Sequence, residues 1–282
     1  MRRGLFFAQL GFTIAVCAFM VVPVILSVLA GVTVNFFQGV RSGLTLRWVQ
    51  QVWGLYADTI VSSVLIALAC LLCTLAIGVP AAYVLAKRPG RLTRAVEELV
   101  VLPLAVPGLA VALALIVTYG GFGEFRKSWA FILVGHVIFT LPFMLRSVLA
   151  VLLAIDFRVL EEGAASLGAN FRQRFFGVVL PNAKPGIVAG SLMVVTLSVG
   201  EFNLTWMLHT PLTKTLPIGL ADSYASMRLE VASAYTLVFF VIIIPLLVAL
   251  QWFGRSPAGT KRLPAGDDPA PMPVTGPRSS AA

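Results

Sequence analysis

Charged side chains are scarce in this chain of 282 residues: Asp, Glu, Lys and Arg make up 12% of it, whereas 59% is hydrophobic. A typical soluble domain carries roughly 25% charged residues, so the composition excludes that class. The scarcity of charge leaves long apolar runs, and these predict a protein that spans a membrane.

Side chains suited to metal binding and catalysis are also few. The chain has three cysteines, Cys17, Cys70 and Cys73, and two histidines, His136 and His209. The Cys70-x-x-Cys73 spacing occurs in zinc and redox sites, but the pair falls in an apolar run without a nearby histidine, so we interpret it as packing and expect no metal site. The chain has no Ser/His/Asp arrangement, no H-E-x-x-H and no pair of intramembrane aspartates. We therefore expect that it is not an enzyme.

Two further absences bear on partners. The sequence has no phosphate-binding G-x-x-x-x-G-K-[ST] motif, so the chain is not expected to bind ATP in that way. Its net charge is +9, yet the basic residues form no stripe interleaved with aromatics. Nucleic acid is therefore not an expected partner.

Six nearly charge-free stretches have about the ~20 residues that a helix needs to cross a bilayer. They cover residues 5–29, 59–86, 99–118, 128–153, 185–208 and 231–253. We predict an all-α membrane protein with six transmembrane helices in one membrane domain, residues 1–254. The uncharged run at 4–40 is too long for the apolar part of a signal peptide, so the first helix is expected to be retained. Pro103, Pro107 and Gly108 predict a kink or an opening in the third helix.

The Lys and Arg residues predict how the helices are oriented. With the N-terminus in the cytoplasm, fourteen fall in cytoplasmic segments and six in outer segments, once Arg146 inside the fourth stretch is set aside. This bias follows the positive-inside rule. Both termini are then cytoplasmic, and the segment 255–282, rich in Pro, Gly, Ala and Ser, is predicted to be a disordered cytoplasmic tail.

The polar segment at 155–182, between the fourth and fifth stretches, is the part of the chain best suited to touch a soluble protein. Small residues allow a partner to approach closely, and a glycine permits a sharp reversal of the chain. We predict a short helix, a turn and a second helix here. The positions that define the pattern are Glu162, Gly163, Ala164, Gly168, Leu180 and Pro181.

This spacing resembles the EAA loop of permease subunits in ATP-binding-cassette (ABC) importers: Glu-Ala-Ala, three residues, Gly, and a later Leu-Pro. Gly163 departs from it, because the family usually has alanine there. The resemblance implies the type I importer permease fold over residues 5–254 and a bacterial cytoplasmic (inner) membrane location. It also implies that the loop docks on a separate ATPase subunit, which uses ATP and Mg²⁺, whereas this chain binds no cofactor.

The same resemblance implies further partners. A second permease subunit, identical or different, would complete the translocation pathway within the lipid. An extracytoplasmic substrate-binding protein would meet the outer segments at residues 30–58 and 212–230.

Glu201 is an ionisable residue inside the fifth stretch, close to Asn203. Such groups usually face the interior of a helix bundle or a water-filled route. Glu201 and Asn203, with Pro103 and Pro107 of the third stretch, are therefore candidates for lining the pathway. Alternatively, Glu201 pairs with another polar group or ends a helix and reaches water.

The substrate expectation rests on resemblance within the family. Residues 102–108 and 210–217 are most similar to those of polyamine (spermidine/putrescine) and 2-aminoethylphosphonate permeases, with ferric iron, sulfate, molybdate and thiamine permeases as near alternatives. An alternative of another class is an ATPase-independent secondary transporter. Such a protein would be expected to carry more intramembrane charges or a repeat symmetry.

Overall fold

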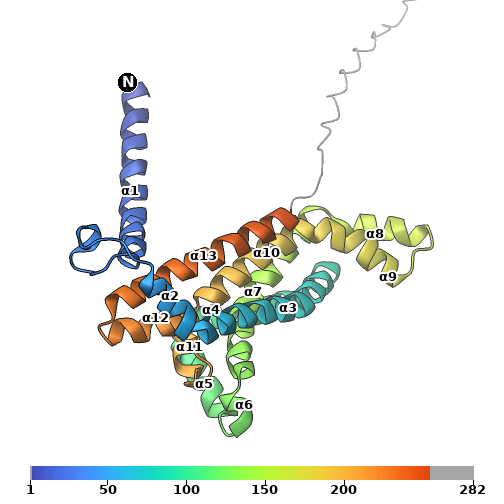
Figure 1. Cartoon of the computed structure of the whole chain (residues 1–282). Coiled ribbons are helices and arrows are strands. Elements are labelled where there is room, and N and C mark those ends of the chain that lie inside the picture. Colours follow the sequence, from blue (N-terminus) through green and yellow to red (C-terminus); the bar gives the residue numbers. More distant parts are fainter. Residues whose placement is uncertain (1, 255–282) are drawn as a thin grey trace, which may run out of the picture.

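The computed structural model describes residues 2–254 and is helical apart from turns and one isolated β-bridge in that part of the chain. The all-α prediction is confirmed, and the predicted tail at 255–282 lies outside the described residues. Figure 1 shows a bundle of long helices with a pair of short helices projecting from one end and a single helix standing apart.

Five helices are long and apolar enough to cross a membrane, and two shorter helices complete a sixth span. Helices α4 and α5 are bent by 104° at a short break, and we count this pair as one broken span. Counted this way, the described residues contain the six predicted spans. The elements are α1 (Arg2–Ala30), α3 (Ala57–Lys87), α4 (Arg91–Ala105), α5 (Gly108–Tyr119), α7 (Trp129–Ala154), α10 (Leu180–Gly200) and α13 (Leu229–Gly254).

The break between α4 and α5 lies at Val106 and Pro107. Val106 has extended backbone angles (φ −98°, ψ 131°), as expected for a residue before proline, because the proline ring disfavours the helical region there. Pro107 lacks an N–H and precedes the first residue of α5, where no helical hydrogen bond is lost. The predicted opening of this span is confirmed, and it is larger than a kink.

The fifth span differs from its prediction as one continuous helix at 185–208. Helix α10 ends at Gly200, Glu201 is extended (φ −70°, ψ 121°), and a separate short helix, α11 (Asn203–Leu208), follows. At its other end, α10 begins at Leu180 and continues a helical segment made of α9 (Phe171–Arg174) and the π-helical turn η2 (Phe175–Val179).

Helices α3, α7 and α10 form the centre of the bundle, and α13 packs against α10. Glycines allow close approach: methyl groups placed on Gly78 and Gly190 would lie 2.9 Å and 2.8 Å from Met144 side-chain atoms of α7. Such small residues are typical of contacts between membrane helices. The helices around this centre include α2 (Arg47–Leu55), α6 (Gly123–Lys127) and α12 (Leu216–Ala225).

Helix α1 stands away from the bundle (Figure 1), and residues 4–26 of it are all exposed. It meets the rest of the chain at its C-terminal end, where Gly31 lies directly against the α13 backbone at Ser233 and Ala234. The exposed residues 4–26 leave a large apolar surface to be covered by lipid or protein.

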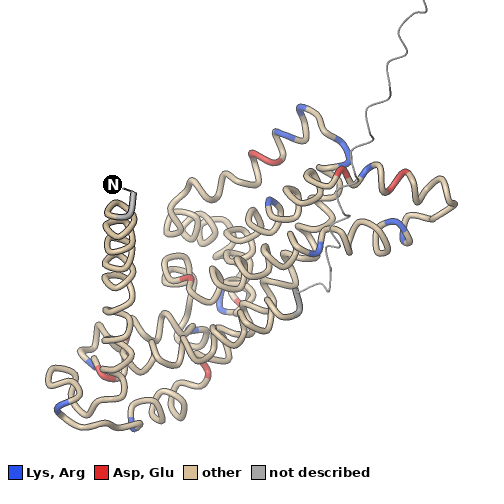
Figure 2. The backbone as a smooth tube through the Cα atoms, turned by 90° about the horizontal axis from the view of Figure 1, so that it is seen from above, with Lys and Arg blue, Asp and Glu red and all other residues tan. Residues whose placement is uncertain are grey.

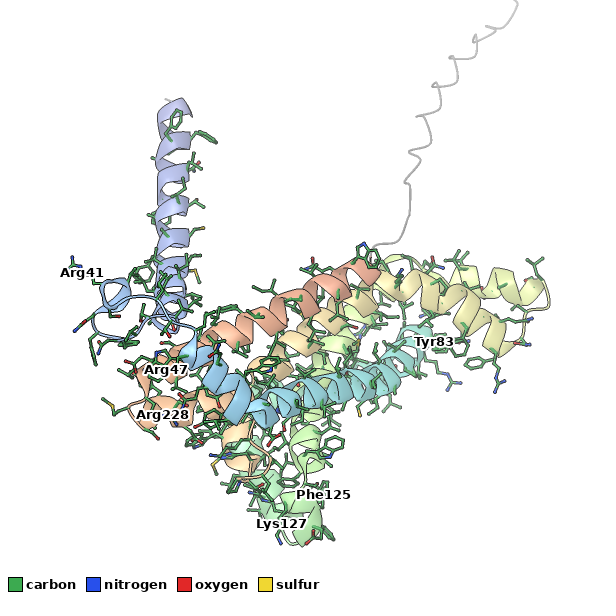
Figure 3. The ribbon with its side chains drawn as sticks, viewed as in Figure 1. Arg41, Arg47, Tyr83, Phe125, Lys127 and Arg228 are labelled. Carbon is green, nitrogen blue, oxygen red and sulfur yellow. The ribbon has the colours of Figure 1, made fainter. Side chains whose placement is uncertain are left out.

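The two ends of the bundle carry different elements. Helices α8 (Phe157–Ser166) and α9 project from the end at which α3 finishes, near Tyr83, whereas Arg47 and Arg228 lie towards the other end (Figure 3). The projecting part contains both acidic and basic residues (Figure 2).

Candidate functional site

The projecting loop has the predicted form of helix, turn and helix. Asp156 adopts a left-handed conformation (φ +45°) directly before α8. The chain reverses at Gly168 (φ +83°), where the Gly168 N–H donates to Ala165 O at 2.9 Å and the Ala169 N–H to Ala164 O at 3.1 Å. This pair of bonds is the Schellman arrangement that ends many helices, and it favours glycine at the left-handed position.

The second helix of the loop starts with a capping box. The Asn170 side chain accepts a hydrogen bond from the Gln173 N–H, and the Gln173 side chain accepts one from the Asn170 N–H. The π-helical turn then leads to α10, whose first residue, Leu180, is half-buried and whose second, Pro181, is exposed. Pro181 therefore stands just after the π-helical turn, at the point where α10 continues the loop's second helix.

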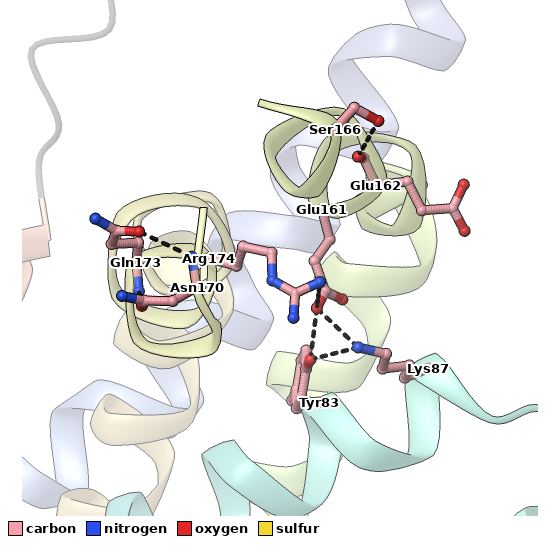
Figure 4. A network of polar contacts seen from close by, with 8 residues as sticks. All are labelled: Tyr83, Lys87, Glu161, Glu162, Ser166, Asn170, Gln173 and Arg174. Atoms are coloured by element: carbon pink, nitrogen blue, oxygen red, sulfur yellow. Dashed lines mark hydrogen bonds and ion pairs between the residues drawn. The ribbon is translucent and has the colours of Figure 1, made fainter. Parts of the chain in front are cut away.

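The predicted contact residues lie on the outside of the loop. Glu162 and Gly163 are exposed, Ala164 is half-buried, and Leu167 beyond them is 90% exposed. The Glu162 carboxylate points away from the helices and meets no partner within the described residues (Figure 4). A free carboxylate beside exposed apolar and small residues is a surface that another protein can cover.

The neighbouring Glu161 faces a different side of α8, towards the end of α3 (Figure 4). Its side chain is only 4% exposed, and its Oε1 lies 2.7 Å from Lys87 Nζ and 3.6 Å from Arg174 Nη1. The Tyr83 hydroxyl donates to the same oxygen at 2.8 Å. Glu161 therefore joins the end of α3 to α8 and α9.

The environment of Glu161 favours its charged form. Burial raises the pKa of the carboxyl, but hydrogen bonds from Lys87 and Tyr83, with the positive charges of Lys87 and Arg174, outweigh burial and hold the pKa below its usual value. Aromatic rings surround this ion pair: the Tyr83 ring lies 5.8 Å from Phe157 and 5.4 Å from Phe175. We conclude that Glu161 is a buried anion with dedicated partners.

The motif spacing did not indicate Glu161. A signal was present in the helix period, because Glu161 lies four residues after Phe157 and therefore on the same face of α8 as that buried aromatic. Its partner Lys87 is 74 residues away in sequence. Spacing alone could not have paired the two.

The candidate pathway residues lie at the two helix breaks, and the structure brings these breaks together. A methyl group placed on Gly108, at the start of α5, would lie 3.6 Å from Asn203 Cβ and 3.8 Å from Glu201 Oε1. Asn203 and Pro107 are exposed, and Pro103 is half-buried within α4. The meeting of two broken spans is a place where irregular backbone can line a cavity in a membrane protein.

Glu201 uses both carboxylate oxygens to cap α11. The Leu204 N–H donates to Oε1 at 3.0 Å, and the Thr205 N–H and hydroxyl donate to Oε2 at 2.9 and 3.0 Å. A carboxylate at a helix N-terminus satisfies unpaired N–H groups and the positive end of the helix dipole. This geometry agrees with the alternative that Glu201 has a structural partner.

His136 contacts the helices on both sides of the break at Glu201. Its ring, buried on α7, lies 2.8 Å from the hydroxyl of Ser198 in α10 and 2.8 Å from that of Thr205 in α11. Because the Thr205 hydroxyl donates to Glu201, it accepts from Nε2 of His136. Sequence reasoning assigned no role to His136, since both hydroxyls lie more than 60 residues away.

Comparison with known proteins gives a family match and several relatives. The model of the family described as "Binding-protein-dependent transport system inner membrane component" matches residues 75–258. The molybdenum transport system permease protein of Mycobacterium tuberculosis is 31% identical over 205 residues, which are 67% of this chain and 75% of that protein. The molybdate/tungstate transport system permease protein of Pyrococcus abyssi is 27% identical over 198 residues, 70% of this chain and 78% of that protein. A putative 2-aminoethylphosphonate transport system permease protein of Salmonella choleraesuis is 27% identical over 220 residues, 76% and 83% of the two chains.

Proposed function

The chain belongs to the family of inner membrane components of binding-protein-dependent transport systems, and from this premise we propose that it forms the pathway of an ABC importer driven by a separate ATPase. The single observation that carries the proposal is the projecting loop at 155–182. It presents Glu162, Gly163 and Leu167 to solvent on a helix whose two ends are fixed. The chain has no phosphate-binding motif of its own, and in this proposal the energy comes from a partner subunit.

The ATPase would cover the exposed face of α8. Glu162 can make a charge-assisted hydrogen bond to a donor on the partner, which is about twice as strong as a neutral one. Leu167 supplies an apolar contact at the tip of the loop. With the ATPase on this face, the loop is cytoplasmic, and we propose that both termini are cytoplasmic too, which the distribution of Lys and Arg in the sequence supports.

The remaining partners cover other surfaces of the chain. The exposed side chains of α1 support a second permease subunit, identical or different, which would pack on part of this helix. Lipid would contact the rest of the helix. At the opposite end from α8, the outer segments that carry Arg47 and Arg228 would meet the substrate-binding protein.

For the substrate, we propose a tetrahedral oxyanion of the molybdate or tungstate type. Two of the relatives named above carry molybdenum or molybdate/tungstate in their names and a third carries 2-aminoethylphosphonate, whereas none of the three is a polyamine permease. The geometry of Glu201 offers no support for a polyamine. Both its oxygens are bound at the α11 N-terminus, so this carboxylate is not free to pair with a cation at the helix breaks.

The test uses vesicles that contain the permease and its ATPase, with the binding protein outside and radiolabelled molybdate, spermidine or 2-aminoethylphosphonate as probes. Glu162→Lys should abolish ATP-dependent uptake and co-purification of the ATPase while membrane insertion stays normal. The matched control is Glu98→Gln, which changes an exposed carboxylate on α4.

Several results would contradict the proposal. Uptake that persists without the ATPase would support the secondary transporter. Normal uptake by Glu162→Lys would remove this face of α8 from the contact with the ATPase. Transport of spermidine but not molybdate would restore the polyamine expectation.

A further inference from the structure

Helix α8 is attached to the end of α3 at two separate points. The Arg158 guanidinium donates to Ala86 O through Nε at 3.2 Å and Nη2 at 2.9 Å. One turn further along α8, Glu161 binds Lys87 and Tyr83 at 2.7 and 2.8 Å. Two attachments about one helical turn apart resist rotation as well as separation of the two helices.

The carboxylate of Glu161 also lies against the returning arm of the loop. Arg174 of α9 has its Nη1 3.6 Å from Glu161 Oε1, and within the described residues its buried Nε has no hydrogen-bond partner. The rings of Phe171 and Phe175 pack on Tyr83 at 6.2 and 5.4 Å. Glu161 is therefore the point at which α3, α8 and α9 meet.

A buried charge of this kind is costly to separate from its partners. Once Lys87 is withdrawn, the carboxylate remains out of water with fewer donors, and breaking one side of such a pair is strongly unfavourable. The contact therefore favours movement of the three elements as one body. Helix α3 in turn packs against α7 and α10, the centre of the bundle.

We propose that Glu161 is a positioning residue that locks α8 to the end of α3, so that a displacement imposed on the exposed face of α8 moves α3 with it. The inference rests on the proposed function, because it takes the ATPase as the source of that displacement. Glu162 and Glu161 then have separate tasks: the first contacts the partner, and the second passes the movement into the membrane.

The mutational test measures ATPase binding, ATP hydrolysis and molybdate uptake separately in the reconstituted complex. Glu161→Gln and Lys87→Met should keep ATPase co-purification and hydrolysis within about twofold of the unmodified complex, yet reduce the molybdate transported per ATP by tenfold or more. Lys87→Arg, which keeps a positively charged donor for Glu161, should retain most of this ratio. Glu98→Gln is the control for loss of a carboxylate that has no partner within residues 2–254.

The outcomes separate the lock from the proposed function. Unchanged transport per ATP in Glu161→Gln would show that Glu161 does not couple α8 to α3. Loss of ATPase binding in this variant would also contradict the proposal, because it would make Glu161 part of the contact surface. If the unmodified complex neither binds the ATPase nor transports with ATP, the proposed function itself fails.

A second measurement needs no variant. Hydrogen exchange is measured in the unmodified complex without nucleotide and after hydrolysis of ATP in the presence of vanadate, which leaves ADP and vanadate bound. Exchange should change together in α8 and at residues 79–87 of α3. A change confined to α8 overturns the lock even where the variants fail to fold.

Discussion

Two glycines in the loop allow a matched test of its backbone. Gly168 has φ +83°, whereas Gly163 lies within α8, and a methyl group placed on either would meet nothing within 4 Å. Alanine at both positions adds the same atoms without a clash. Any difference in stability between Gly168→Ala and Gly163→Ala therefore reports the backbone conformation alone.

The expected difference follows from the conformations. Alanine in the left-handed region costs about 1 kcal/mol at Gly168, and alanine in place of glycine inside a helix stabilises α8 by about 1 kcal/mol at Gly163. The two variants should differ by about 2 kcal/mol in the free energy of opening α8, or roughly 30-fold in its equilibrium constant.

Hydrogen exchange of the whole chain in detergent micelles measures this opening directly. It is read by mass spectrometry in the proteolytic peptide that covers residues 157–170. Gly168→Ala should exchange faster than the unmodified chain and Gly163→Ala more slowly. Equal exchange in the two variants would refute the reversal at Gly168. The same result would also show that Gly163, where the family usually has alanine, does not weaken the helix.

Two further predictions concern packing and pH. A methyl group on Gly186 would lie 2.5 Å from Ser147 O of α7, so Gly186→Ala should destabilise the bundle by about 1–3 kcal/mol. Gly54→Ala is the control, because a methyl group on Gly54 would meet nothing within 4 Å. Thermal unfolding in detergent compares the stabilities of the two variants. The pKa of Glu161 is lower in the folded protein than in the unfolded chain, where it is about 4.3. The stabilisation that Glu161 gives to the folded loop is therefore complete above the unfolded pKa and is lost as the pH falls through the lower folded pKa. The rate of amide hydrogen exchange in α8, corrected for the intrinsic pH dependence of exchange, should therefore be constant from neutral pH to about 5 and should rise in stronger acid. In Glu161→Gln this rise should be smaller.

The spans could be predicted because their signal is local. A run of apolar residues without charges identifies a helix wherever it packs, and two prolines close together in the third span identified its break. The break at Glu201 has no such signal. It depends on the α11 N–H groups that Glu201 caps and on His136 from α7, and these partners come together only once the bundle is packed.

The site shows the same division. Fixed spacing indicated the loop, its reversal at Gly168 and the exposed side that carries Glu162. It could not distinguish the inward-facing Glu161 from its neighbour, because that distinction requires Tyr83 and Lys87 from a helix far away in the sequence. The substrate is harder to predict than the loop, because no described residue at the helix breaks has a free charge that selects a cation or an anion.

The two left-handed residues that bound α8 determine which mutations the loop can tolerate. Asp156 fixes where the helix begins and Gly168 where the chain turns back, so the number of residues between them is set. A single inserted residue before Glu161 would rotate everything after it by about 100°, moving the inward carboxylate off Lys87. In related genes, the length of this stretch should stay constant, whereas the extracytoplasmic segments can vary in length.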